Sequence, residues 1–200
     1  MRVLLPRIHA VLRAVHRTEA IYRPVKIDTI LSAIKETGVI KEIFLIPSDL
    51  LTDVLQAKII VKQLDGARIA NIYYAKDAPK PEQRFAIAKE TVHIFDEQNE
   101  KTVADKNLEK LLDDLCVNGS DLQTPEIVAE NRARLGAIEL LVPYEARMVL
   151  KGSWIAAKYD IKTIADAYGV PERVMRRAIN DSYNEQIKAA RKECGLPNIE

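Results

Sequence analysis

A glutamate and a histidine three residues apart, Glu90 and His93, lie in the stretch RFAIAKETVHIFDE at residues 84–97. In the pattern H-E-x-x-H, two histidines one helical turn apart hold a zinc ion, and the glutamate between them activates a metal-bound water. This chain has the glutamate and the second histidine, but Lys89 stands where the first histidine would be. The stretch therefore resembles the signature of metal-assisted hydrolysis with one ligand replaced.

These residues fall in a segment with helical spacing, which we expect to form a helix over residues 82–96. Side chains four positions apart share a face of a helix, so Lys89 and His93 lie together with Glu90 beside them. The adjoining face is an apolar stripe made of Phe85, Ala88, Val92 and Phe95. A glutamate and a histidine at this spacing also occur on amphipathic helices without any special role, so the pattern alone does not assign a function.

A second stretch, EIVAENRARLGAIELLVP at residues 126–143, predicts another helix over residues 126–141. Together with the Arg84-Phe85 pair before the first motif and TIADAYGVPERVMRRAI at residues 163–179, it makes the chain resemble the ImmA/IrrE family of H-E-x-x-H metallopeptidases. The resemblance covers roughly residues 25–180, and Gly136 departs from the aromatic residue usual in the family. The positions that match the family pattern in the second helix are Glu130, Ala133, Ala137, Leu140, Leu141 and Pro143.

The resemblance implies a zincin-like fold in which Glu90 is the catalytic base and His93 and Glu130 are metal ligands, with zinc as the cofactor. It also implies a regulatory role, since proteins of this kind cleave or bind helix-turn-helix repressors in bacteria, mobile elements and phages. We therefore expect a repressor or another protein as the partner.

Lys89 leaves three arrangements open. Lysine binds a metal only as a neutral amine, and removing its proton at pH 7 costs about 4–5 kcal/mol. A donor from elsewhere, His9, His16 or Cys116, would complete the site only if its segment packed over the helix. Alternatively, the Lys89 ammonium pairs with Glu90 or Glu130 and no metal binds, or a weaker site forms from His93, Glu130 and waters, with Glu90 as a further ligand.

The composition is that of an ordinary globular protein. The chain has 200 residues, 48% hydrophobic and 30% charged, and a formal net charge of +1. A charge this small does not indicate binding to nucleic acid or to a membrane. Two widely separated cysteines indicate no disulfide framework and favour a reducing, cytoplasmic location. Because Pro6 and several arginines interrupt the first apolar run, we expect neither a signal peptide nor a membrane-spanning helix.

The remaining pattern predicts helices, then a small sheet, then further helices, which is an α+β fold. Two β-rich runs around Asp65-Gly66 predict a hairpin, and Thr124 is the expected N-cap of the helix over residues 126–141. We expect a zincin-like domain at residues 1–150 and a helical segment at residues 151–200. The other predicted elements are helices at 7–21, 27–37, 49–57 and 105–115, strands at 39–47, 58–64 and 67–75, and two shorter helices and a long last one within 144–192.

The segment KTIADAYGVPERVMRRAIN also resembles a helix-turn-helix, with a small residue at Ala165 and a turn at Gly169. The basic side chains after the turn, which would meet DNA or a partner, are Arg173, Arg176 and Arg177. Residues 151–200 hold nine Lys/Arg and seven Asp/Glu, a net charge of only +2, which is a weak electrostatic footprint for a DNA-binding protein. The alternative is that this helix pair simply closes the core below the first motif.

Two classes of function remain open from the sequence. The first is an ImmA/IrrE-like regulatory peptidase or a descendant of one that has lost its metal. The second is a non-catalytic module that binds DNA or a protein through the C-terminal helices. Metal content is the property that separates them most directly.

Overall fold

The computed structural model describes residues 3–17, 20, 23–50, 56–96, 125–155 and 159–197. The predicted helix at 105–115, the cap at Thr124 and the side chain of Cys116 lie outside these ranges, as does the middle of the predicted helix at 49–57.

The sheet has three strands, β1 (Glu42–Ser48), β2 (Ala57–Leu64) and β3 (Ala67–Ala75), in the order β1-β3-β2. β1 pairs with β3 in parallel, and β2 pairs with β3 antiparallel. The hairpin predicted around Asp65-Gly66 is confirmed. Both turn residues have positive φ, 49° and 77°, which the tight two-residue turn between twisted strands requires.

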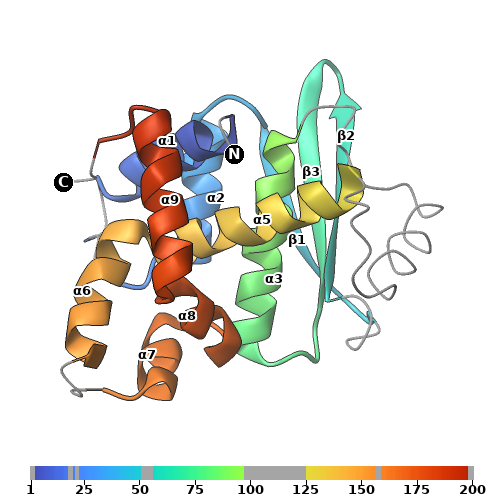
Figure 1. Ribbon diagram of the computed structural model, residues 1–200. Coiled ribbons are helices and arrows are strands. Elements are labelled where there is room, and N and C mark those ends of the chain that lie inside the picture. The colour runs from blue at the N-terminus through green and yellow to red at the C-terminus, as the bar shows by residue number, and fades with distance from the viewer. Residues whose placement is uncertain are drawn as a thin grey trace.

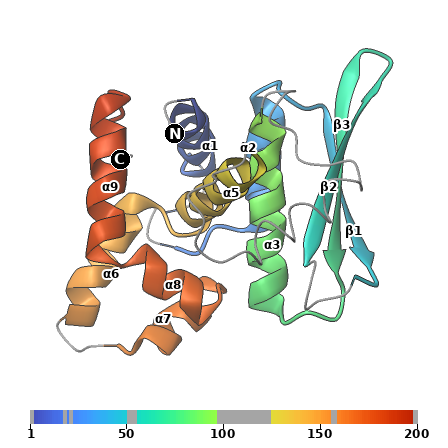
Figure 2. The same cartoon turned by 45° about the vertical axis from the view of Figure 1, so that its right-hand side comes forward.

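Helix α3 (Lys80–Val92) packs on one face of this sheet and carries the first motif. Figure 2 shows it between the sheet and the other helices, with α5 (Pro125–Leu141) crossing it on the side away from the strands. α2 (Ile27–Glu36) contacts both α3 and β1. The expected α+β arrangement, with the second motif helix beside the first, is therefore what the chain adopts.

The last turn of the first motif is tighter than the sequence predicts. α3 ends at Val92, and η1 (His93–Phe95) continues it as a 3-10 turn, in which the amide of Asp96 donates to the carbonyl of His93 at 3.2 Å. The prediction of one continuous α-helix to residue 96 is therefore wrong for residues 93–96, since the α-helix ends at Val92 and a 3-10 turn follows. Such tightening is common where the last carbonyls of a helix lack α-helical partners.

The first helix, α1 (Leu4–Val15), lies beside α2 and α5 (Figure 1) and packs on both, and several of its apolar side chains belong to the core. The sequence analysis predicted this helix at residues 7–21, but it begins earlier, at Leu4, and ends at Val15. Pro6 lies in the first turn, where its missing N–H would have had no partner within the helix, so the helix can begin before it.

Four helices, rather than the predicted three, occupy the described part of residues 144–193. Polar caps and a proline divide them: Asp160 accepts from the amide of Thr163 at 2.7 Å, Pro171 precedes the third, and Asn180 accepts from the amide of Tyr183. The helices are α6 (Tyr144–Ile155), α7 (Ile161–Tyr168), α8 (Glu172–Ala178) and α9 (Asp181–Glu193). No helix within the described ranges has the length and apolar character to cross a membrane.

A buried polar network fastens the C-terminal helices to the rest of the molecule. The guanidinium of Arg147, which is completely buried, contacts Glu139 of α5 at 2.8 Å and donates to Asn184 of α9 at 2.9 Å. Tyr183 donates to the same Glu139 carboxylate at 3.0 Å. Because buried charges require such partners, the network fixes α6 and α9 against α5. The division of the chain at residue 150 remains a prediction.

Candidate functional site

Lys89 is held between two carboxylates. Its ammonium lies 2.9 Å from Oε1 of Glu130 and 3.0 Å from Oε1 of Glu90. The Lys89 side chain is 19% exposed and the two carboxylates 11% and 6%, so the three charges share a largely dry environment. Burial by itself lowers the pKa of Lys89, but the two carboxylates outweigh it, and the net shift is upward. The lysine is therefore a fixed cation at neutral pH.

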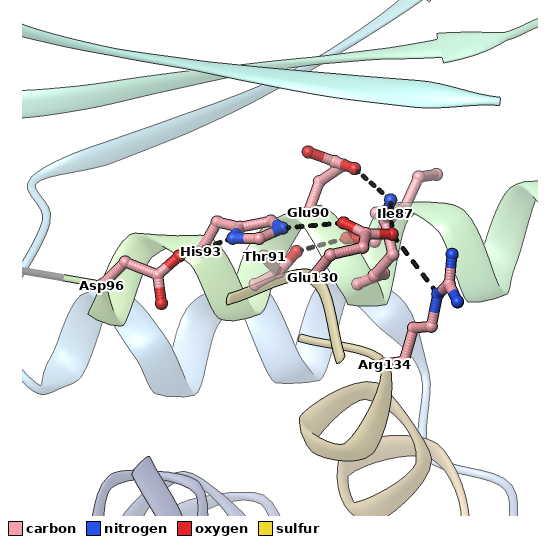
Figure 3. A network of polar contacts seen from close by, with 8 residues as sticks. Ile87, Glu90, Thr91, His93, Asp96, Glu130 and Arg134 are labelled. Atoms are coloured by element: carbon pink, nitrogen blue, oxygen red, sulfur yellow. Dashed lines mark hydrogen bonds and ion pairs between the residues drawn. The ribbon is translucent and has the colours of Figure 1, made fainter. Parts of the chain in front are cut away.

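Glu130, on the second turn of α5, is the hub of the site. Its carboxylate contacts Lys89, Nε2 of His93 at 3.5 Å and Nε of Arg134 at 3.3 Å. Burial favours the neutral acid, but hydrogen bonds and charge attraction from His93 and Lys89 hold the pKa of Glu130 well below its usual range. Figure 3 shows the Glu130 side chain between His93 and Arg134. One carboxylate thus forms ion-pair contacts with three basic side chains.

His93 has a second partner that the sequence reasoning missed. Its Nδ1 lies 2.5 Å from Oδ2 of Asp96, on the side of the ring away from Glu130 (Figure 3). Burial lowers the pKa of His93, but the hydrogen bonds to Asp96 and Glu130 prevail and raise it to about 9. The i,i+3 spacing of His93 and Asp96 was the available signal. A carboxylate behind an imidazole orients the ring, as it does for histidines that bind metals.

The described residues do not form a zinc site. No group of three or more His, Cys, Asp or Glu side chains placed to hold a metal ion occurs among them. A fixed ammonium ion between Glu90 and Glu130 supplies the positive charge that a metal would bring to these carboxylates. His9, a donor considered from the sequence, is instead directed toward the carbonyl of Pro197, with Nε2 at 3.1 Å. Among the described residues, the ligand set that the motif implies is thus incomplete, since Lys89 stands in place of its first histidine.

The basic residues of α8 lie beside this site. Lys89 and Glu130 line a cleft of about 390 Å³ whose other walls come from β2, α5 and α8, including Arg173 and Arg177. Arg173 contacts Glu82 of α3 at 2.6 Å and lies over the ring of Phe85. Arg176, by contrast, pairs with Glu172 on its own helix at 2.5 Å and is not among the lining residues. The structure therefore brings two of the three predicted arginines to the motif helix.

Comparison with known families finds one family whose domain includes both motif helices. A family model described as the IrrE N-terminal-like domain, Peptidase_M78, matches residues 50–180. The chain belongs to this family. The match includes α3, α5, α7 and α8, so both motifs and the cleft fall within the family domain. Neither a search of curated proteins nor a search of solved structures found a match.

Gly136 explains how the second motif helix of this family member reaches the first. A Cβ atom at this position would lie 2.9 Å from both methyl carbons of Val92 and 3.5 Å from Cδ1 of Ile8. Without a side chain here, α5 can approach α3 closely at the turn that precedes His93. This close approach helps to bring Glu130, two turns earlier on α5, within reach of Lys89 and His93.

Proposed function

We propose that this chain is a metal-free, non-catalytic member of its family, which binds a repressor-type transcription regulator without cleaving it. The observation that carries the proposal is the Lys89 ammonium, 2.9 Å from Glu130 and 3.0 Å from Glu90. A zinc-bound water needs a metal held by neutral imidazoles and carboxylates, and a proton acceptor that is free to take its proton. Here Glu90 pairs with an ammonium ion instead.

The state of His93 supports the same conclusion. An imidazole ligates a metal through an unprotonated nitrogen, whereas in the metal-free protein Asp96 and Glu130 raise the pKa of His93 to about 9, so a metal would have to displace its proton at neutral pH. Its two nitrogens are directed to Glu130 and Asp96. The site is thus stabilised as a network of ion pairs, which favours a role in recognition.

The repressor is proposed as the partner because of the family resemblance, and the cleft gives it a place to bind. The cleft of about 390 Å³ lies over the motif helix, where a peptidase of this kind would receive its substrate. Binding at this cleft requires no metal, because its lining side chains themselves offer charged and apolar contacts.

The test combines metal content, cleavage and binding. Protein purified without a chelator or a metal-binding tag is analysed for zinc and then incubated with a helix-turn-helix repressor from its own genetic neighbourhood. We expect far less than one zinc per chain, an intact repressor, and binding by calorimetry that is unchanged by EDTA. Stoichiometric zinc together with repressor cleavage that Glu90→Gln abolishes would refute the proposal.

DNA binding by α7 and α8 is the alternative, and the arrangement of the arginines disfavours it. The Gly169 turn between α7 and α8 is left-handed, with φ 60°, as in many helix-turn-helix units. However, Arg173 is engaged with Glu82 and Phe85 of α3, and Arg177 lines the cleft. A recognition helix requires such side chains to face outward into a groove of the duplex.

A further inference from the structure

We propose that the cleft over Lys89 binds a peptide segment in which a carboxylate lies next to an apolar side chain, and that Arg134 and Arg177 are the partners of that carboxylate. The inference rests on the proposed function, because it specifies the chemistry of the partner that the same cleft would take.

The first argument is charge. Four of the residues that line the cleft are basic, and one is acidic, which gives the lining a net charge of +3. The single acidic residue, Glu130, is already shared by Lys89, His93 and Arg134. Glu90 and Glu82, just outside the lining, pair with Lys89 and Arg173, so the charge of about one guanidinium group remains unbalanced at the cleft, and it attracts an anion.

The second argument is the state of the individual arginines. Arg173 has a carboxylate of its own, Glu82, at 2.6 Å. Arg134 contacts Glu130 through Nε alone, and its side chain is 42% exposed. Arg177 makes no hydrogen bond or ion pair through its side chain with any residue in the described ranges. Two guanidinium groups, from α5 and α8, thus have free donors at the cleft.

The third argument is the apolar part of the lining. Phe85 of α3, which is half-buried, contributes hydrocarbon surface to the same cleft, and the buried side chains of Ile138 and Val174 also line it. A bare inorganic anion would leave this surface in contact with water, whereas an aliphatic or aromatic side chain would cover it. A carboxylate on a peptide with an apolar neighbour satisfies both the donors and the apolar surface.

A nucleic acid fits these observations less well. Phosphates on a duplex are contacted by basic side chains spread over an extended outer surface. Here Arg173 and Arg177 line a cleft, and acidic residues accompany the basic ones, with Glu82 beside Arg173 and Glu172 beside Arg176. The whole chain has a net charge of only +1. These features favour an acidic peptide.

The experiment uses a fluorescein-labelled peptide of alternating leucine and glutamate, and the same peptide with glutamine in place of glutamate. Binding to the full chain is measured by fluorescence anisotropy in the presence of EDTA. Arg177→Gln is the test variant, and Arg176→Gln is its matched control, because Arg176 lies on the same helix but outside the cleft. Circular dichroism confirms that both variants are folded.

We expect the glutamate peptide to bind about tenfold more tightly than the glutamine peptide, and Arg177→Gln to weaken it about fivefold or more, as for a partly desolvated charged hydrogen bond. Arg176→Gln should bind like wild type. Equal affinity for the two peptides, no saturable binding, or equal loss in both variants would overturn the inference. So would a labelled DNA duplex that binds more tightly than the peptide and responds equally to both substitutions.

These outcomes are separate from those of the proposed function. A zinc-free protein that leaves the repressor intact but does not distinguish the two peptides would refute only the acidic-peptide inference. Stoichiometric zinc with repressor cleavage would refute the proposed function whatever the result with the peptides.

Discussion

The ammonium of Lys89 and the carboxylate of Glu130 lie 2.9 Å apart, although 41 positions separate them in the sequence. They come from α3 and α5, the two helices that carry the family motifs. Glu130 is the position at which the family resemblance implies a metal ligand, and Lys89 is the position at which it implies another. The ion pair thus joins two expected ligand positions to each other, and the Lys89 ammonium brings a positive charge to the Glu130 and Glu90 carboxylates.

Lys89→His should raise the affinity for zinc by at least about tenfold, because an imidazole needs almost no proton removed at pH 7 and would lie beside His93 and Glu130. Calorimetric titration of zinc into wild type and variant at pH 7 measures the change. Adding His93→Ala to the variant should remove the gain. Equal zinc affinity in wild type and Lys89→His would mean that any metal binds elsewhere.

Glu130→Gln should destabilise the fold by about 3–5 kcal/mol, since it removes the shared partner of several buried or half-buried cations. Glu90→Gln should cost less, about 1–3 kcal/mol, because Lys89 keeps its contact with Glu130. Urea unfolding at pH 7 gives both values. A Glu90→Gln protein as stable as wild type, but lacking a peptidase activity that wild type shows, would make Glu90 a catalytic base instead.

The stability of the protein should fall as the pH rises from about 6.5 to 9. The pKa of His93 is raised from 6.5 to about 9 in the folded state, so the folded state binds its proton more tightly than the unfolded state. The resulting stabilisation is complete below pH 6.5 and is lost as the pH passes through 9, and it amounts to at most about 3 kcal/mol.

Urea unfolding at several pH values between 6.5 and 9.5 tests this dependence, and Asp96→Asn serves as the comparison. The variant removes the charge behind the His93 ring and should show a flatter profile over the same range. A wild-type profile that is level or rises with pH would contradict the assignment of a charged His93.

Gly136→Ala should destabilise the protein by about 1–3 kcal/mol, although alanine is the better helix former. The added methyl group would lie 2.9 Å from the Val92 side chain, which is completely buried. Gly152→Ala in α6 is the control, because, its chain neighbours and own helix backbone aside, no described atom lies within 4 Å of the added methyl group. This control should gain about 0.5–1 kcal/mol. Thermal unfolding of the two variants should therefore move in opposite directions.

Much of the fold followed from local patterns. The hairpin was predictable because Asp65-Gly66 can adopt positive φ at both positions, and the two motif helices because their apolar residues recur at helical spacing. The helix ends were less predictable. Pro6 does not exclude a helix that begins before it, and the 3-10 turn at His93 depends on hydrogen bonds of the last carbonyls that no residue type encodes.

The sequence alone determined that a lysine replaces the first ligand of an H-E-x-x-H helix, that Glu130 is the expected third ligand, and that the chain resembles one family. It left open whether a metal site would form with Lys89 or a donor from elsewhere, whether Lys89 would pair with Glu90 or Glu130, or whether a weaker site would form from His93, Glu130 and waters. The pairing of Lys89 with Glu130 came only from the tertiary structure, because it depends on the close approach of α5 to α3, which Gly136 permits. The placing of Arg177 at the cleft likewise depends on how α8 packs against α3, a contact between segments distant in sequence that spacing within either segment cannot specify.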